Sequence, residues 1–244
     1  MYNSVKSIAR RVIPGRLLAR YECMLRGIIA IRYRGNRHRC NICGYGLRTF
    51  VELNDEERLC PRCGSLSRAR RLFTILEKEM NSGERVLHFS PSGAIKRAYE
   101  SRSDIQYIST DYAGEFAADK CIDITDIDEL ENIYDKIICY HILEHIEEDR
   151  KAMTELLRIL KPGGSCFIQT PFSEEMYEDQ SIISPEERLI HFGQEDHVRV
   201  YSVEGLQHRL TEQGFSVEVL LMYGDTDDYF GLRPGEYVLK ARKP

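Results

Sequence analysis

YDKIICYHILEHIEEDRKAMTELLRILKPGGSCFIQT, residues 134–170, carries the clearest secondary-structure signals of the chain. Residues 134–139, which end in the apolar run Ile137-Ile138-Cys139, predict a strand, and residues 149–160 have the spacing of a helix. Lys161-Pro162-Gly163-Gly164 should end that helix, because proline cannot continue a helix and glycine adopts the left-handed conformation of C-caps. Residues 165–170 predict a second strand. The order strand, helix, strand indicates a parallel α/β unit.

The sequence on both sides continues this alternation. Further strands are predicted at residues 85–89, 106–110, 120–124, 216–223 and 236–240, and helices near 95–100 and over 202–213. Ser202 is suited to cap the second of these helices. Residues 171–200 are long and polar for a connection, which predicts a lid or substrate loop. We therefore expect a Rossmann-like α/β domain whose mostly parallel sheet has seven strands, the last of them antiparallel.

Four segments are expected along the 244 residues. They are a basic helical arm (1–35), a Cys-rich zinc ribbon (36–66), a linking helix (67–83) and the α/β domain (84–244).

Hydrophobic residues make up 42% and charged residues 30%, a composition typical of globular proteins rather than disordered ones. No apolar run reaches the ~18 residues that span a bilayer, and the first residues lack a secretory pattern. We expect a cytoplasmic protein.

The charge is unevenly distributed. Residues 1–39 hold ten Lys or Arg against one acid, Glu22, whereas the whole chain has a net charge of −5. This asymmetry favours an anionic partner for the arm, such as the inner membrane surface or a nucleic acid. Packing of the arm against its own acidic domain is an equally simple interpretation.

Two of the cysteine pairs have metal-ligand spacing. Cys40-x-x-Cys43-Gly44 and Cys60-x-x-Cys63-Gly64 are separated by sixteen residues. Each pair can place two thiolates on one ion from a tight turn, with glycine accommodating a positive φ. A closed Cys₄ set suits structural Zn²⁺; iron is the chemical competitor, and four unrelated buried cysteines are the simplest alternative. The solitary Cys23, Cys121, Cys139 and Cys166 are expected to be core residues.

Three segments should meet at the carboxyl edge of the sheet, where ligands bind in open α/β folds. They are the turn His88-Phe89-Ser90-Pro91-Ser92-Gly93, Asp111 after the second strand, and Asp123 after the third. Asp111 lies in the range of a carboxylate that accepts from ribose hydroxyls. A strand-end Asp that merely stabilises a turn is the alternative.

Together these segments resemble class I S-adenosylmethionine-dependent methyltransferases. The resemblance covers about residues 84–220 and rests on RVLHFSPSG, STD ending at Asp111, DIT from Asp123, IICYHILEHI, LLRILKPGG and HVRVYSVEGL. The chain has, in this order, a strand, the LEH motif, a helix, LKPGG and a further strand. NAD enzymes share the ribose-binding acid but lack these segments. His88 replaces the family's acid, and serines replace its glycines. The paired CxxCG motifs further resemble zinc-ribbon methyltransferases often predicted from bacterial surface-polysaccharide gene clusters.

The resemblance implies roles for individual residues. His88, Phe89, Ser90 and Gly93 would line the methionine and ribose part of S-adenosylmethionine, and Asp111 would bind the ribose hydroxyls. Asp123 and Ile124 would meet the adenine, while Tyr140 and His141 would flank the sulfonium end. The cofactors expected are therefore S-adenosylmethionine and a structural Zn²⁺.

Methyl transfer to a hydroxyl or amine usually needs a base within hydrogen-bond reach of the acceptor. His197 and His191 are the candidate bases, because both lie in the predicted loop over the crevice; solvated loop histidines are the alternative. His145 is expected to pack or cap at the LEH motif.

The expected function is O-methylation of a small molecule or glycan. An RNA methyltransferase that holds RNA through the ribbon and arm, and a non-catalytic binding module, are the alternatives.

Overall fold

The computed structural model describes residues 24–53, 57–112, 118–224, 227–233 and 235–244. The chain forms two compact units, each built from separate stretches of sequence. The first unit consists of Met1–Glu79, Ser92–Ser101 and Tyr223–Pro234, and the second of Met80–Pro91, Arg102–Met222 and Gly235–Pro244. Each unit is described by itself below.

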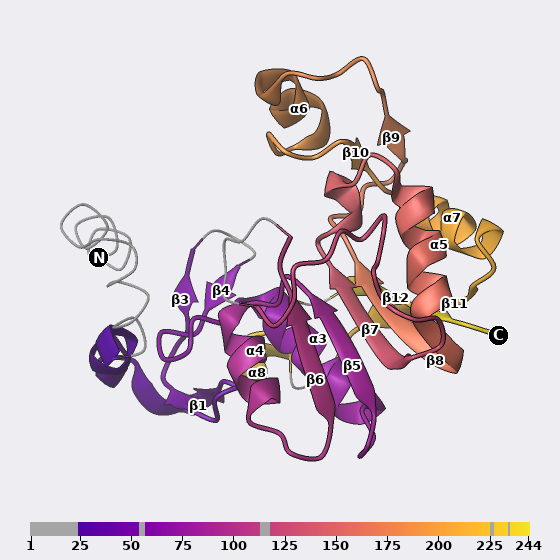
Figure 1. Ribbon diagram of the computed structural model, residues 1–244. Helices are drawn as coiled ribbons and strands as arrows, with labels where there is room; N and C mark the ends of the chain where they lie inside the picture. The colour runs from indigo at the N-terminus through magenta and orange to yellow at the C-terminus, as the bar shows by residue number, and fades with distance from the viewer. Residues whose placement is uncertain (1–23, 54–56, 113–117, 225–226, 234) are drawn as a thin grey trace. The chain divides into compact units, whose positions relative to one another are not determined.

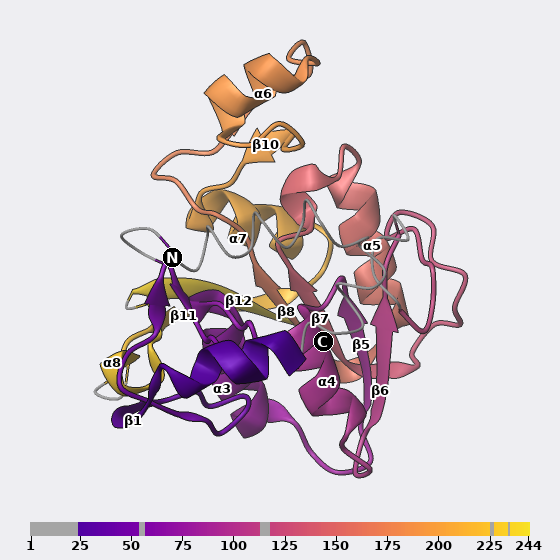
Figure 2. The ribbon, with the colours of Figure 1, turned by 90° about the vertical axis from the view of Figure 1, so that its left-hand side faces the viewer.

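The second unit contains the central sheet (Figures 1 and 2). Its strands are β5 (Arg85–Phe89), β6 (Gln106–Thr110), β7 (Tyr134–Tyr140), β8 (Leu160–Gln169), β11 (Ser216–Met222) and β12 (Glu236–Arg242). Their order is β11-β12-β8-β7-β5-β6. Strands β6, β5, β7 and β8 are parallel, whereas β12 pairs in the antiparallel sense with both β8 and β11. The α/β class and the antiparallel last strand are thereby confirmed.

The predicted third strand, residues 120–124, is reduced to one bridge, so the sheet has six strands rather than seven. Lys120 forms an isolated parallel bridge with Thr110. The chain then turns, because the Asp123 carboxylate accepts from the backbone N–H and hydroxyl of Thr125, both at 2.8 Å. Ile122 and Ile124 are nevertheless buried, so the alternating pattern fills the core without strand pairing.

The main core lies between the sheet and two helices, α5 (Asp149–Ile159) and α7 (Val203–Glu212). Alternate residues of the strands contribute to it, together with one face of each helix. The cluster includes Leu87, Phe89, Ile137, Cys139, Cys166, Ile168, Met153, Leu156, Leu206 and Leu210. The Ser202 hydroxyl accepts from the N–H of Gly205, which confirms the predicted N-cap. Cys139 and Cys166 are core residues, as expected, whereas Cys121 is exposed, so the prediction was wrong for that cysteine.

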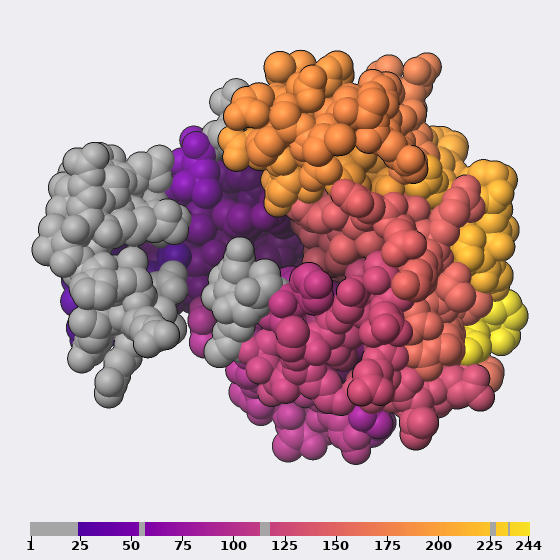
Figure 3. Space-filling view, turned by 45° about the horizontal axis from the view of Figure 1, so that its top comes forward, coloured from indigo at the N-terminus to yellow at the C-terminus, as the bar shows by residue number. Residues whose placement is uncertain are grey.

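Residues 171–200 carry secondary structure of their own. Strands β9 (Tyr177–Glu178) and β10 (Arg199–Val200) form a short antiparallel ladder, and α6 (Pro185–Phe192) lies between them. Figure 1 shows α6 beyond this ladder, away from the sheet. In the space-filling view the segment forms a raised orange surface beside the region that holds α5 (Figure 3). A short 3₁₀ helix, η1 (Leu143–His145), connects β7 towards α5.

The first unit contains the Cys-rich segment. Its elements are β1 (Arg34–Arg39), β2 (Gly46–Leu47), β3 (Val51–Glu52), β4 (Arg58–Leu59), α3 (Ser67–Glu79), α4 (Gly93–Glu100) and α8 (Asp227–Phe230). The strands form two hairpins, β1–β2 and β3–β4. Of the predicted basic arm, residues 24–31 are helical and residues 1–23, Cys23 included, lie outside the described part. Within the described part, every helix is too short or too polar to cross a membrane.

Candidate functional site

The four predicted metal ligands meet in the first unit. Cys40, Cys43, Cys60 and Cys63 have sulfur atoms within 4.8 Å of one another. The separations of Cys40 from Cys63 and of Cys43 from Cys60 are 3.7 and 3.8 Å. A tetrahedral zinc site with Zn–S bonds of about 2.3 Å has sulfur–sulfur edges of about 3.8 Å, so this donor set fits Zn²⁺. Gly44 and Gly64 have φ values of 69° and 81°, as the knuckle geometry predicted.

Arg70 is the electrostatic partner of this thiolate set. Its side chain on α3 is fully buried, and burial lowers the pKa of its guanidinium while the Cys40, Cys60 and Cys63 thiolates raise it. The guanidinium donates to the carbonyls of Ser65, Arg58, Phe230 and Gly231 at 2.6–2.9 Å. It also lies 4.2 Å from the centre of the Phe50 ring. A cation so placed offsets the negative charge of a zinc–thiolate centre.

The predicted cofactor residues of the second unit lie at the carboxyl ends of its strands. His88 is 2% exposed near the end of β5, and its Nδ1 lies 2.9 Å from the Tyr107 hydroxyl. Burial lowers the pKa of His88 to about 3, so the ring is neutral. Ser90 follows with φ 43°, a left-handed conformation in which glycine is less strained. Ser90 therefore has a backbone conformation that favours glycine, the residue that the family has in this turn.

Asp111 and its neighbours provide polar groups at the same edge. Asp111 is buried directly after β6, where its carboxylate is suited to two ribose hydroxyls. The buried Thr110 Oγ1 and Gln169 Oε1 have no hydrogen-bond partner within the described residues. Because an unpaired buried polar atom is costly, these two oxygens favour a polar ligand at the ends of β6 and β8. They are additional site candidates, and the sequence alone assigned no role to either side chain.

The remaining predicted cofactor residues have distinct environments. Asp123 is exposed, and its bonds to Thr125 lower the pKa of its carboxyl. Ile124 belongs to the main core, and Tyr140 is buried at the end of β7. Gly93 begins α4 in the first unit. Their roles towards the cofactor stay predictions.

A histidine and carboxylate cluster follows β7. His141 has a φ of 55°, and its Nδ1 lies 3.2 Å from Glu144 Oε1. The rings of His145 and His197 stand edge to face, with centroids 4.7 Å apart. His197 is 3% exposed, and burial, reinforced by the charge of His145, lowers its pKa. Its imidazole is therefore neutral near pH 7 and can accept a proton.

Backbone and arginine contacts hold this cluster together across more than fifty residues of sequence. The N–H of Val198 donates to the Glu144 carbonyl at 2.9 Å, which places His197 beside η1. Arg199 is 2% exposed and donates to the carbonyls of Leu143, Ile146 and Glu147. Sequence reasoning missed Arg199, because an arginine in a polar stretch carries no sign that it will be buried.

The second candidate base lies elsewhere. His191 is exposed on α6, and its ring packs at 6.1 Å from that of Tyr177. None of its described contacts involves the cluster at η1. The structure thus brings His197, but not His191, together with His141 and His145.

Comparison with known proteins identifies the family of the chain. A family model described as a methyltransferase domain matches residues 66–220, more than half of the chain. The chain belongs to this methyltransferase family. The class I S-adenosylmethionine-dependent methyltransferase resemblance seen in the sequence is therefore confirmed. No curated protein sequence matches the chain.

Solved structures share this fold at low identity. Phosphoethanolamine N-methyltransferase 2 of Haemonchus contortus, in complex with S-adenosylmethionine, has a TM-score of 0.52 and 17% identity. The match covers 71% of this chain but 52% of that protein, so the chain spans about half of its length. The [4+2]-cyclase SpnF has a TM-score of 0.52 at 15% identity, covering 94% and 95% of the two chains. YcgJ of Bacillus subtilis has a TM-score of 0.51 at 14% identity, and the match covers 71% of this chain and 98% of that protein. These likenesses concern the fold alone.

Proposed function

We propose that this methyltransferase transfers the methyl group of S-adenosylmethionine to a hydroxyl oxygen of a small molecule or glycan. The observation that carries the proposal is the neutral His197 imidazole in a cluster beside the end of β7. In open α/β folds this edge of the sheet is where the ligand binds. A hydroxyl acceptor needs to lose a proton, and a neutral imidazole can take it.

The cofactor would supply the electrophilic methyl group, and the protein would orient the reactants. Asp111 would accept from the ribose hydroxyls, and the turn from His88 to Ser90 would approach the methionyl part. Tyr140 and His141 would face the sulfonium. His197 is the proposed proton acceptor, and His191 would serve only if α6 closed over the acceptor.

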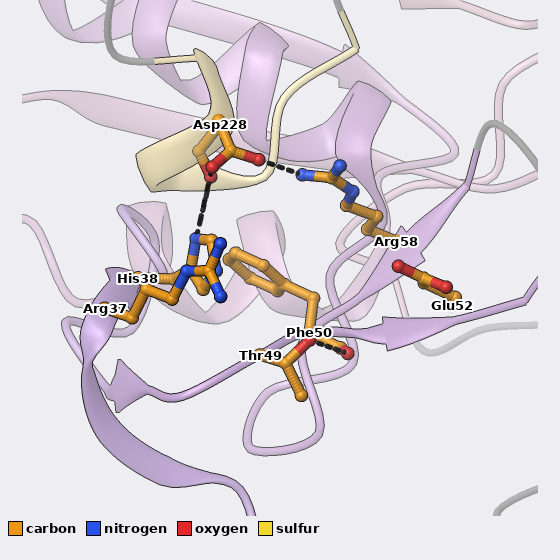
Figure 4. Close-up of a pocket in the computed structure, with 7 residues that line it drawn as sticks. All are labelled: Arg37, His38, Thr49, Phe50, Glu52, Arg58 and Asp228. Atoms are coloured by element: carbon orange, nitrogen blue, oxygen red, sulfur yellow. Dashed lines mark hydrogen bonds and ion pairs between the residues drawn. The ribbon is translucent and has the colours of Figure 1, made fainter.

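The RNA alternative has less support from the first unit. A hollow of about 180 Å³ there is lined by Arg37, His38, Thr49, Phe50, Glu52, Arg58 and Asp228 (Figure 4). Arg58 is paired with the Asp228 carboxylate at 2.8 Å, and His38 Nδ1 lies 2.9 Å from the Asp228 carbonyl. These acidic and carbonyl groups offset the cations, whereas a phosphate-binding surface would present them unopposed.

Calorimetric titration with S-adenosylmethionine tests the cofactor site. We expect micromolar affinity, about −8 kcal/mol, in the wild type. Asp111→Ala should weaken binding by tenfold or more, because a hydrogen bond to a charged group contributes about 1.5–3 kcal/mol. Asp128→Ala, which changes an exposed acid of the same unit, is the matched control. A folded, zinc-loaded wild type that does not bind S-adenosylmethionine would support the non-catalytic alternative.

Transfer of a labelled methyl group tests the acceptor. Hydroxylated glycans and small molecules should become labelled at oxygen, and this labelling should change little with salt. Labelling of RNA that falls steeply as salt rises would instead support the RNA alternative, because phosphate contacts release counterions.

A further inference from the structure

Three side chains, two in η1 and one just before β10, have the composition of a metal site distinct from the cysteine cluster. Glu144, His145 and His197 each offer a ligand atom, and these atoms lie within 4.8 Å of one another. A tetrahedral ion with bonds of about 2.1 Å has ligand edges of about 3.4 Å, so small inward rotations of the side chains would complete the site. All three residues belong to the second unit.

The hydrogen bonds of the imidazoles leave the correct nitrogen free. His197 Nδ1 lies 3.2 Å from the Phe192 carbonyl, an acceptor, so Nδ1 carries the proton and Nε2 the lone pair. His145 Nδ1 is likewise 3.2 Å from an Asp196 carboxylate oxygen and 3.3 Å from the Asp196 carbonyl. Metal-binding histidines typically donate their other N–H to a carbonyl or carboxylate in this way.

Buried atoms without partners point into the same cluster. Glu144 is 1% exposed, and within the described part of the chain its Oε2 has no hydrogen-bond partner. The same holds for Nε2 of His197 and Nε2 of His141, whose Nδ1 contacts the other Glu144 oxygen. Leaving such polar atoms unpaired is expensive in a protein interior, and one cation bound between Glu144 and His197 would satisfy two of the three.

We propose that Glu144, His145 and His197 bind a divalent transition-metal ion, with His141 positioning the Glu144 carboxylate through its 3.2 Å contact. Two imidazoles and one carboxylate suit Mn²⁺, Fe²⁺, Co²⁺, Ni²⁺ or Zn²⁺, whereas Mg²⁺ and Ca²⁺ prefer sets composed of oxygen. Three protein ligands leave coordination positions open, as catalytic sites do. Of the three ligands, His145 is the one that is partly exposed, whereas Glu144 and His197 are buried.

The role of the ion rests on the proposed function. A hydroxyl acceptor bound to the cation would lose its proton to solvent water more readily, since the cation lowers the pKa of a bound hydroxyl. The acceptor oxygen then donates its electron pair to the methyl carbon. The carbon–sulfur bond breaks, and sulfur keeps the bonding pair as the sulfonium becomes a thioether. The two proposals therefore assign His197 different roles: it is the proton acceptor when the site is metal-free, and a ligand when the cation is bound and activates the acceptor in its place.

Titration of the full, zinc-loaded chain with Co²⁺ tests the site by a readout other than activity. We expect one equivalent to bind with the visible absorption of a nitrogen and oxygen site, without the thiolate charge-transfer bands that exchange at the cysteines would produce. His197→Ala and the nearly isosteric Glu144→Gln should each weaken binding by tenfold or more. His208→Ala, at an exposed position on α7, is the matched control and should bind Co²⁺ as the wild type does.

The outcomes separate this inference from the proposed function. A wild type that takes up no Co²⁺ outside the cysteines, or folded variants that bind it as tightly as the wild type, would overturn the metal site. S-adenosylmethionine binding, measured in parallel without added metal, reports on the methyl-donor site alone. Binding of S-adenosylmethionine without binding of Co²⁺ leaves the methyltransferase proposal intact. Binding of Co²⁺ without binding of S-adenosylmethionine leaves the metal site intact.

Discussion

His88 couples the stability of the second unit to pH. The resemblance to methyltransferases places His88 where the family has an acid, and the structure buries the ring against Tyr107. In the unfolded chain the imidazole takes up a proton below its ordinary pKa of 6.5, whereas the folded state resists protonation down to a pKa of about 3. Acid therefore favours the unfolded state. The stability contribution of neutral His88 is complete above pH 6.5 and is lost as the pH falls towards 3.

Replacing His88 with a residue that does not titrate should flatten this dependence. Between pH 6.5 and pH 5 the wild type should lose about 2 kcal/mol through this group, at about 1.4 kcal/mol per pH unit. His88→Asn should be less stable at neutral pH but should lose about 2 kcal/mol less over the same interval. Urea denaturation at the two pH values measures both free energies of unfolding. Parallel losses in the two proteins would show that His88 takes up its proton equally in the folded state.

At the scale of elements, buried charges connect β9, β10 and α7 to the start of α5. Arg199 contacts the Glu178 carboxylate at 2.8 Å, and Arg209 pairs with both Glu178 and Asp149. The Tyr201 hydroxyl donates to Asp149. Arg199 also holds the carbonyls that follow η1, so this network fixes the loop that carries Glu144 and His145.

Loss of the Arg199 guanidinium should destabilise the fold strongly. Arg199→Met keeps the aliphatic stem but leaves three carbonyls without their donor and removes one of the two arginines that pair with Glu178, a change that costs about 3–5 kcal/mol for a buried pair. Arg188→Met removes an arginine whose 3.5 Å contact is to the exposed Glu147, and it should cost less than about 1 kcal/mol. Urea unfolding of the two variants checks the difference. Equal losses would mean that burial of Arg199 contributes no net stability.

The sequence predicted elements better than contacts between them. The strands expected at residues 85–89 and 106–110 match β5 and β6, and the helix expected at 149–160 matches α5, because apolar runs and helical spacing are local signals. Residues 120–124 misled the prediction, since a turn held by Asp123 buries Ile122 and Ile124 as a strand would. The cysteine set was readable because its ligands lie in two local motifs. The cluster of His197 with Glu144 was not, because it depends on pairing between segments far apart in sequence.

At the scale of the whole molecule, each unit combines segments that the sequence separates. In the first unit, Arg70 on α3 donates both to Ser65 beside the cysteines and to the carbonyls of Phe230 and Gly231. Arg97 on α4 donates to the Cys63 carbonyl at 3.0 Å. The cysteine cluster is therefore bonded directly to α3 and α4, and through Arg70 to the segment after α8.

Removal of the metal should consequently loosen distant parts of the first unit together. A structural Zn²⁺ held by the four cysteines would contribute folding free energy, so the Cys₄ segment should open when a chelator extracts the ion, or in Cys40→Ser. Hydrogen exchange should then show lost protection at residues 36–66, 92–101 and 227–233, while β7 and β8 keep theirs. Cys121→Ser, at an exposed cysteine outside the cluster, should exchange as the wild type does. Loss confined to residues 36–66 would mean that the arginine contacts do not couple these segments. Equal loss in β7 and β8 would mean that the two units unfold as one, with zinc stabilising the whole chain.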